Sequence, residues 1–541
     1  MKKYINKILP VLFAFIGSAL LTGCDDFLDE TPNKSGSAYI YHMDQLKELS
    51  GSLDLYLFDA PGDVYITYGI TGGYMSDQIF LTDAIEIDPD YFTYGLKRSP
   101  YNYMKYTLDK EELVNNQYNM LTTWTPSWER IYRFNTILHN IDKVEQTNQQ
   151  THDQVAGEAY FGRAYYHFIL MLSFCLWDEN APGIGYRDGV APGEIPARET
   201  VGYTLGRIYE DLDKAEELLT KAGCTKFNLK TSFRPTVPTV KALKARVDLY
   251  RGNYDSALKN ANAALTAHST LVTFKNDPNY ELVPSTTFNL LNEDNTAIKG
   301  TLQAMVPFAL LNLALQPVTL YEELYLPSIS TGDFCPVSEK LYNLFDREND
   351  ARWIYFYNSN YPLMFAPGSF YTAVIDGVQT KNCISNETQK WLKPWHAHCY
   401  YRFHGNGPVK LLGMTTAEMM LIKAECLARG GKTDEAAQVL KDLRATRFLN
   451  TEAANNIGGS VQDVLDERDR EFAGLWRFYD IKRLNGAEKA GISVSRVILS
   501  DPTDINSKTT MTIGPDDPHW AMPIYSGEIA NLGWKQNEGW N

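Results

Sequence analysis

The feature that most constrains this chain is an internal repeat that places the same small and turn-forming residues at the same offsets in two distant segments. Each copy has apolar residues at spacings of three and four, then a glycine-containing break, then a second apolar period. Each copy is therefore predicted to be a helix, a tight turn and a second helix. The matching residues are Ala245, Gly252, Asp255 and Ala257 in the first copy and Ala424, Gly431, Asp434 and Ala436 in the second.

The repeated hairpins predict an all-α fold. Small alanines at a helix crossing let two helices approach closely, as in tetratricopeptide repeats with their unit of ~34 residues. We therefore expect tetratricopeptide-like helical hairpins that scaffold a loop-rich, irregular ligand-binding face. The same periodicity predicts further amphipathic helices over residues 128–144, 154–174, 203–221 and 461–484.

Residues 266–415 separate the two repeats, lose this periodicity and gain Pro, Gly, Asn and aromatic residues. A long irregular insertion in an ordered protein is usually a functional elaboration. We expect one body rather than several domains, although the 541 residues would suggest three or four by length alone. The predicted parts are a signal peptide (1–23), a tether (24–37) and a body (38–541), itself divided into an N-terminal helical-repeat part (38–265), the loop-rich insertion (266–415) and a C-terminal helical part (416–541).

Composition excludes some classes of protein. The chain has 51 Lys and Arg against 66 Asp and Glu, a formal net charge of −15, so it has no basic excess with which to neutralise nucleic-acid phosphates. Its hydrophobic content of 44% and charged content of 22% indicate neither disorder nor a membrane-embedded bundle. Tyrosine is abundant, with 34 residues, and a phenol combines a flat apolar face with a polar tip.

The first 23 residues are predicted to be a secretory signal. Lys2, Lys3 and Lys7 precede the apolar run 8–21, which is shorter than the ~20 residues that a spanning helix needs. Cys24 follows small residues in a pattern that resembles the lipobox of bacterial lipoproteins, so we expect its thiol to carry a lipid that anchors the chain without spanning the membrane. An ordinary signal with a chance cysteine is the alternative.

Removal of the signal would remove three lysines and no acidic residue, leaving 48 basic and 66 acidic residues and a net charge of −18. We therefore expect contact with the membrane mainly through the lipid. Besides Cys24, six cysteines would remain, without a Cys-x-x-Cys pair that would suggest zinc or redox chemistry. Cys383 and Cys399 are the candidate disulfide pair, and buried free thiols are the alternative.

Several segments carry a more specific pattern. They are the start from Cys24 to Pro32, the helix from Gly157 to Tyr166, the helix from Thr416 to Glu425, the charged stretch from Glu467 to Arg483, and the ending with Met522-Pro523-Ile524 and Gln536-Asn537-Glu538-Gly539-Trp540. Together they resemble the SusD-like (RagB/SusD) family of surface glycan-binding lipoproteins, from Cys24 to the C-terminus. The chain departs from the family pattern at Gly413-Met414, where an arginine is usual, and at Tyr525, where a second proline is common.

The resemblance implies an all-α fold of tetratricopeptide-like hairpins with a variable, loop-rich face. It implies that the protein captures oligosaccharides at the outer surface of a Gram-negative outer membrane and passes them to a TonB-dependent SusC-like transporter. It implies no enzymatic activity and no cofactor apart from the lipid on Cys24, and no metal ion is predicted. The glycan itself is not implied, because the family's ligand residues lie in its variable regions.

Three motifs have alternative interpretations. The alternating charges of Glu467 to Arg483 suit intrahelical ion pairs better than an acid–base site. His396, His398 and His404 have the chemistry of zinc ligands, but no fourth ligand is suitably spaced, so surface histidines are preferred. Gly431-Lys432-Thr433 lacks the leading glycine of a phosphate-binding loop, since Cys426 stands there, and is predicted to be a repeat turn.

Sugar binding needs aromatic planes that stack on a pyranose and polar groups that bond its hydroxyls. Residues 39–134 hold 19 aromatics in 96 positions, above the 13% of the whole chain. Core packing is the alternative for any one of them. The candidate residues are Asp77, Asp83, Tyr91, Tyr94, Tyr101, Tyr103, Tyr106, Asn115 and Trp124 in this region, followed by Tyr321, Tyr325, Trp391 and Trp395 in the insertion.

We therefore expect a non-enzymatic surface glycan-binding lipoprotein. Two other functions remain open on the sequence. A surface glycoside hydrolase would need two carboxylates roughly 5–9.5 Å apart across a sugar, and no such pair is evident. A helical-repeat scaffold for protein partners would need no sugar site at all.

Overall fold

The computed structural model describes most of the helical body and parts of the insertion. For 76–77, 79, 100–103, the strands from 282 to 331, and 354–411, only the backbone is described. The described residues are 40, 42–51, 76–86, 100–116, 123–145, 148–191, 193–227, 234–271, 273, 282–283, 287–291, 297–301, 306–307, 329–331, 337–358, 370–375, 378–383, 398–399, 409–411, 414–472, 474, 476–501, 504 and 506–541.

The repeated segments form the two helical hairpins that the sequence predicts. The first consists of α11 (Val237–Arg251) and α12 (Tyr254–Ala267), and the second of α17 (Thr416–Arg429) and α18 (Thr433–Arg447). Gly252 and Gly431 end the first helix of each hairpin with φ of 75° and 76°, a left-handed conformation that favours glycine. The small residues predicted at the crossings, Ala245, Ala257, Ala424 and Ala436, are all buried.

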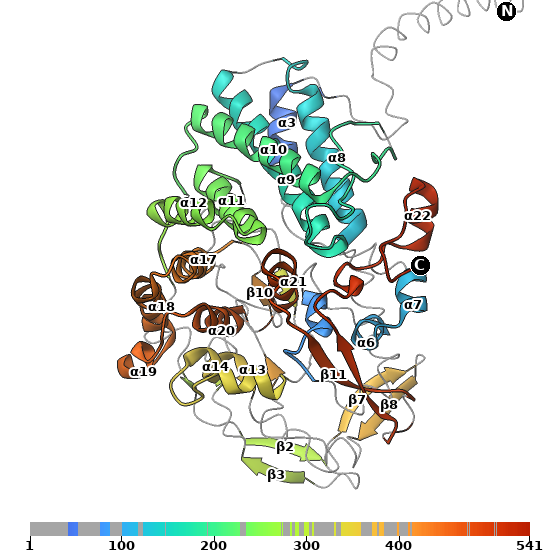
Figure 1. Ribbon diagram of the computed structural model, residues 1–541, viewed down its shortest axis with the longest axis vertical. Coiled ribbons are helices and arrows are strands. Elements are labelled where there is room, and N and C mark those ends of the chain that lie inside the picture. The colour runs from blue at the N-terminus through green and yellow to red at the C-terminus, as the bar shows by residue number, and fades with distance from the viewer. Residues whose placement is uncertain are drawn as a thin grey trace, which may run out of the picture.

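The two hairpins are neighbours in space, because α12 packs directly against α17 (Figure 1). Ala257 and Ala261 on α12 have no exposed surface, which fits this close packing. The chain between them therefore leaves the helical array after α12 and returns to it at the adjacent helix. The insertion that the sequence predicts is an excursion between consecutive hairpins.

At the N-terminal side, α9 (Gln149–Phe174) packs between α8 (Thr125–Asn140) and α10 (Val201–Lys221), with α3 (Met43–Ser50) against α8 and α9 (Figure 1). α9 is buried along most of its length, which explains why apolar residues occur all round it. The predicted helices 128–144, 154–174 and 203–221 are confirmed, with ends shifted by a few residues.

The single helix predicted for 461–484 is wrong, since the structure has α20 (Val461–Phe472) and α21 (Arg477–Glu488) instead. Gly474 lies in the break with φ 76°, and a Cβ on it would lie 2.5 Å from Ala84 Cβ. Both the backbone conformation and the lack of space require glycine here. The alternating charges continue across this break, so the sequence pattern alone predicts one helix.

The remaining described helices are short. They are η2 (Ser76–Leu81), α6 (Pro100–Thr107), α7 (Lys110–Asn115), α13 (Glu339–Leu344), α14 (Ala351–Phe356), α19 (Thr451–Asn455), η8 (Pro518–Trp520) and α22 (Ser526–Leu532).

Strands occur only as two-stranded antiparallel sheets in the described part of the chain. The fold is thus mostly helical, as predicted, and these small sheets are its only regular β structure in the described residues. The pairs are β1 (Leu282–Val283) with β4 (Val306–Pro307), β2 (Thr287–Leu291) with β3 (Ala297–Thr301), β5 (Ile329–Thr331) with β10 (Val409–Leu411), β6 (Tyr357–Asn358) with β9 (His398–Cys399), β7 (Phe370–Ile375) with β8 (Val378–Cys383), and β11 (Val494–Leu499) with β12 (Lys508–Ile513).

Most strands of the insertion that Figure 1 labels lie away from the N-terminal helices. In Figure 1, β2 and β3 lie beyond α13 and α14, and β7 and β8 lie to one side of α13, all four at the opposite end from α3, α8, α9 and α10. A continuous apolar core connects residues of α3, α8–α12, α17, α18, α20 and α21. The helical array is therefore the rigid support from which the insertion projects.

Candidate functional site

Most of the predicted glycan-binding side chains lie outside the part of the chain that the structure describes. Asp77 is in η2, and Tyr101 and Tyr103 are in α6, but only their backbone is described. These candidates stay predictions, as do the disulfide Cys383–Cys399 and the zinc alternative at His396, His398 and His404. The predicted lipidation site Cys24 lies wholly outside the described residues. So do the glycan-binding candidates Tyr91, Tyr94, Tyr321, Tyr325, Trp391 and Trp395.

Trp124 is a core residue, which corrects its prediction as a sugar-stacking residue. Its side chain is 2% exposed, and its ring packs edge-on against Trp128, Phe174 and Trp534 at centroid distances of 5.6, 5.1 and 5.8 Å. Its Nε1 donates a hydrogen bond to Glu528 at 3.4 Å. No face of the indole is available to a pyranose in this structure.

Tyr106 and Asn115 also make contacts within the protein. Tyr106 is buried and donates a hydrogen bond from its hydroxyl to the carbonyl of Val497 at 3.1 Å. Asn115 Oδ1 accepts a hydrogen bond from Ser526 Oγ at 3.1 Å. These two contacts join the 100–116 segment to the C-terminal part of the chain.

Asp83 is placed at a junction of three segments. Its carboxylate accepts hydrogen bonds from Arg477 Nε at 3.0 Å and Nη2 at 3.3 Å, and it also forms an ion pair with Lys340. Burial alone would raise the pKa of Asp83, but Arg477 and Lys340 outweigh it and lower that pKa below its usual range. The carboxylate is therefore charged and engaged with protein cations.

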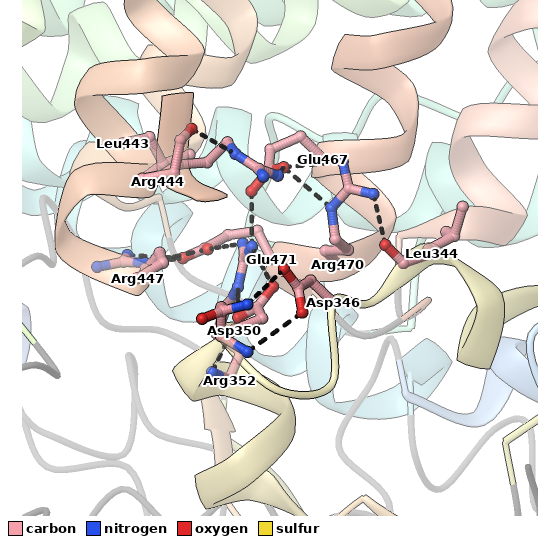
Figure 2. Close-up of polar contacts among 12 residues, drawn as sticks. Leu344, Asp346, Asp350, Arg352, Leu443, Arg444, Arg447, Glu467, Arg470 and Glu471 are labelled. Atoms are coloured by element: carbon pink, nitrogen blue, oxygen red, sulfur yellow. Dashed lines mark hydrogen bonds and ion pairs between the residues drawn. The ribbon is translucent and has the colours of Figure 1, made fainter. Parts of the chain in front are cut away.

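The charged stretch of α20 lies in a buried network of arginines and carboxylates (Figure 2). Glu467 is fully buried and forms ion pairs with Arg352 at 2.7 Å, Arg470 at 2.9 Å and Arg444 at 3.0 Å. Burial alone would raise the pKa of Glu467, yet these three arginines hold it far below its usual range. A carboxylate surrounded in this way is a structural anion rather than a proton donor.

Glu471 extends the network to two further segments. It binds Arg447 of α18 at 2.7 Å and Arg352 at 2.8 Å, while Arg352 also binds Asp350 at 2.8 Å (Figure 2). Arg470 donates a hydrogen bond to the carbonyl of Leu344 at 2.8 Å (Figure 2). The end of α13 and the start of α14, which belong to the insertion, are thereby fixed to the helical array.

α21 is held in the same manner. Asp480 binds Arg468 of α20 at 2.7 Å and Arg483 at 2.8 Å. Arg483 in turn makes a two-point ion pair with Glu425 of α17, with both distances 2.8 Å. α20, α21 and α17 are therefore locked together by charge as well as by apolar packing.

These contacts refine the interpretation of the charged signature. Its structural role fits the geometry, but the expectation of intrahelical ion pairs is mostly wrong, since in the described part of this stretch only Glu467–Arg470 and Asp480–Arg483 are within one helix. The other partners come from elsewhere in the chain. The sequence analysis missed Asp350, Arg352, Arg444 and Arg447, for which the only available signal was the presence of charged residues beside apolar helix positions.

The described residues contain no group of three or more His, Cys, Asp or Glu side chains placed to hold a metal ion. Among those same residues, no helix has the length and apolar character needed to cross a membrane.

The chain thus combines an array of helical hairpins with a long insertion between two adjacent hairpins. Known protein families share this organisation. The family described as "Starch-binding associating with outer membrane" matches residues 86–249, and the SusD family matches residues 405–540. These two matches lie on either side of most of the insertion; the first includes most of α11, and the second includes α17 and α18. The chain belongs to the SusD-like (RagB/SusD) family.

Solved structures share the fold over nearly the whole chain. A SusD superfamily protein from Bacteroides thetaiotaomicron is 17% identical, with a TM-score of 0.59 over 92% of this chain and 99% of that one. A putative sugar binding protein from Bacteroides vulgatus is also 17% identical, with a TM-score of 0.58 over 93% and 100%. A laminarin binding SusD-like protein has 17% identity and a TM-score of 0.53 over 93% and 100%. No curated protein sequence matches significantly.

Proposed function

We propose that this protein captures an oligosaccharide or polysaccharide at the cell surface and delivers it to a partner TonB-dependent SusC-like transporter in the outer membrane. The observation that carries the proposal is membership of a family whose matching model is described as starch-binding and associated with the outer membrane. Similar structures named as sugar binding and laminarin binding support it. Binding and release need no cofactor and no bond cleavage, so the protein is proposed not to be an enzyme.

We assign glycan contact to aromatic planes and polar groups on the face formed by the loops and the insertion. With Trp124 in the core, the remaining stacking candidates are Tyr91, Tyr94, Tyr101, Tyr103, Tyr321, Tyr325, Trp391 and Trp395. Asp77 is the remaining acidic candidate for bonds to the sugar hydroxyls, because the Asp83 carboxylate already binds Arg477 and Lys340. A tyrosine face suits a sugar, which is apolar on its C–H surface and polar at its rim.

A glycan screen followed by calorimetry tests the proposal. Substitution of Tyr91 or Tyr101 by Ala is expected to weaken binding about two- to tenfold each, the range for loss of one aromatic contact. Tyr132→Ala is the matched control, because Tyr132 is 37% exposed on α8 and lies outside the proposed face. Absence of any glycan hit, together with retained transporter binding, would favour a protein-interaction scaffold. Release of reducing ends would favour a hydrolase.

We also propose that a lipid on Cys24 anchors the protein to the outer membrane with its body facing outward. The acidic body, with net charge −18 after removal of the signal, has no electrostatic attraction to an anionic lipid surface. The Cys24→Ala variant is therefore expected to move from the membrane fraction to the soluble fraction. Continued membrane attachment and surface exposure of that variant would contradict the proposal.

A further inference from the structure

Two segments that border the proposed glycan-binding face are joined by backbone and side-chain contacts. Ile85 and Val337 form an isolated antiparallel bridge, and the Ser338 amide donates a hydrogen bond to the carbonyl of Ala84 at 2.9 Å. Ser338 Oγ donates to the carbonyl of Asp83 at 2.6 Å. Residues 76–86 carry Asp77 and precede Tyr91, whereas residues 337–345 belong to the insertion. The junction therefore links the two halves of that face.

Charge reinforces the junction. Asp83 forms an ion pair with Lys340 of α13, which ties 76–86 to the insertion a second time. Arg477, at the start of α21, approaches Asp83 with Nε at 3.0 Å. The opposite side of the same guanidinium lies 3.6 Å from Asp469 of α20. Arg477 is thus shared between a carboxylate of the junction and a carboxylate of the helical array.

Asp469 is poorly compensated for a buried carboxylate. Its side chain lies in a residue that is 8% exposed. Among the described residues, its carboxylate accepts no hydrogen bond, and the cation that it contacts is Arg477, at 3.6 Å. A buried charge without close partners is costly and tends to be neutralised by a proton. Burial is the main reason that the pKa of Asp469 is raised to about 7, with nearby Asp480 and Asp83 adding to the effect.

Among the described residues, the charged groups on the neighbouring elements do not supply another partner. From α17, Glu418 and Glu425 are carboxylates bound to Arg246 and Arg483. From α21, Asp480 is bound to Arg468 and Arg483. From α18, Arg444 and Arg447 are taken up by Glu467 and Glu471. Lys340 of α13 binds Asp83, although its charge also favours the ionised form of Asp469.

We propose that Asp83, Lys340, Arg477 and Asp469 form a proton-sensitive clasp that sets how firmly the two halves of the glycan-binding face are held together. The role of that face rests on the proposed function, whereas the clasp itself rests on the contacts. When Asp469 is protonated, Arg477 is available to Asp83 alone and the junction is firm. When Asp469 is ionised, it competes for Arg477 as an uncompensated buried charge, and the junction opens more readily.

The sign of the effect follows from the raised pKa. A carboxyl group that binds its proton more tightly in the closed form than in the open form favours closure at low pH and loses that contribution as the pH rises through the higher pKa. An opening that exposes Asp469 returns its pKa toward the ordinary value near 3.8. The junction is therefore firmest below about pH 4, loosens as the pH rises toward 7 and changes little above that.

Amide hydrogen exchange of the full-length protein tests the clasp through the Ser338 amide, with rates converted to protection factors to remove the intrinsic pH dependence. In the unsubstituted protein this protection factor is expected to fall about tenfold between pH 6 and pH 8.5, because pH 6 lies one pH unit below the pKa of about 7 and both forms are ionised above that pKa. The Val237 amide, which donates to the carbonyl of Cys224 at 3.0 Å outside the clasp, serves as the internal control.

The Asp469→Asn variant keeps the shape of the side chain without its charge, so its Ser338 protection is expected to stay high across the same pH range. Lys340→Met is expected to lower protection at every pH while the pH step remains, and Lys432→Met, which removes an exposed lysine paired with Glu435, is its matched control. A pH step that persists unchanged in Asp469→Asn, or no step in the unsubstituted protein, overturns the clasp.

Glycan binding is measured separately on the same samples. A protein that shows the pH step but binds no glycan refutes the proposed function and leaves the clasp standing. A protein that binds glycan but shows no pH step refutes the clasp alone. Should Asp469→Asn not fold, the exchange data of the unsubstituted protein together with Lys340→Met still decide the outcome.

Discussion

At the scale of the residue, the contact between α8 and α9 depends on the absence of one side chain. A Cβ on Gly162 of α9 would lie 2.2 Å from Cζ of Phe134 on α8, closer than carbon atoms can approach. Phe134 is itself fully buried, so relief of this clash requires the packed residues around it to shift. Gly162 therefore sets how closely these two helices pack.

We expect Gly162→Ala to lower the free energy of unfolding by about 1–3 kcal/mol, the usual cost of forcing extra atoms into a packed core. Urea denaturation followed by circular dichroism measures the change. The matched control is Gly206→Ala on α10, where a Cβ would meet nothing within 4 Å. That variant should be stabilised by about 0.5–1 kcal/mol, because alanine is the better helix former. Equal effects at both positions would contradict the steric argument.

At the scale of the element, the helical hairpins could be predicted from the sequence because their alanines and turn glycines recur with a helical period. Ala245 and Ala424 are buried at the crossings as that pattern requires. The break at Gly474 could not be predicted, since its cause is the approach of Ala84 from a distant segment. The same limit applies to Glu467, whose partners Arg352 and Arg444 lie on other elements.

A buried ion pair between Arg246 of α11 and Glu418 of α17 shows how charge fixes one hairpin on the next. Both side chains have no exposed surface, and Arg246 Nε lies 2.7 Å from Glu418 Oε1. We expect Glu418→Gln to lower the free energy of unfolding by about 3–5 kcal/mol, because it leaves the Arg246 charge buried without a counterion. Chemical denaturation measures this cost.

The double variant Arg246→Met with Glu418→Leu removes both charges and keeps the volume, so it should recover most of the lost stability. Glu217→Gln is the surface control, because Glu217 pairs with Lys214 and Lys221 at an exposed position and should matter little. A double variant as unstable as Glu418→Gln would show that packing, not the unpaired charge, is responsible.

At the scale of the whole molecule, the fold consists of a helical scaffold and a loop-rich face. The scaffold could be predicted from the sequence, whereas the residues of the face could not. The scaffold is periodic, whereas an aromatic residue for stacking and one for the core look alike in sequence. Trp124 was predicted to be exposed to ligand and is enclosed by Trp128, Phe174 and Trp534. The insertion between α12 and α17 shows how such a face is added without interrupting the array of helices.

The buried carboxylates make the whole molecule sensitive to acid. Burial alone would raise the pKa of Glu425, but Arg483 and Arg429 lower it to about 2, and Glu467 is shifted in the same direction. A lowered pKa contributes stability that is present above the unfolded value near 4.5 and is lost as the pH falls toward the folded value. The midpoint of thermal unfolding is therefore expected to fall steeply between pH 4.5 and pH 2. A midpoint that stays constant over this interval would contradict the assigned charges.

Asp469 acts in the opposite direction, because its pKa is raised to about 7 from an ordinary value of 3.8. The stability it contributes is complete below the unfolded pKa and is lost as the pH rises through 7. The measurement is the difference in unfolding free energy between Asp469→Asn and the unsubstituted protein, so groups common to both proteins cancel. Between pH 6 and pH 8.5 this difference should shift in favour of the variant by about 1.4 kcal/mol, because pH 6 lies one unit below the folded pKa of about 7 and each pK unit corresponds to about 1.36 kcal/mol. A difference independent of pH would mean that Asp469 is charged throughout, and that Arg477 compensates it fully despite the 3.6 Å separation.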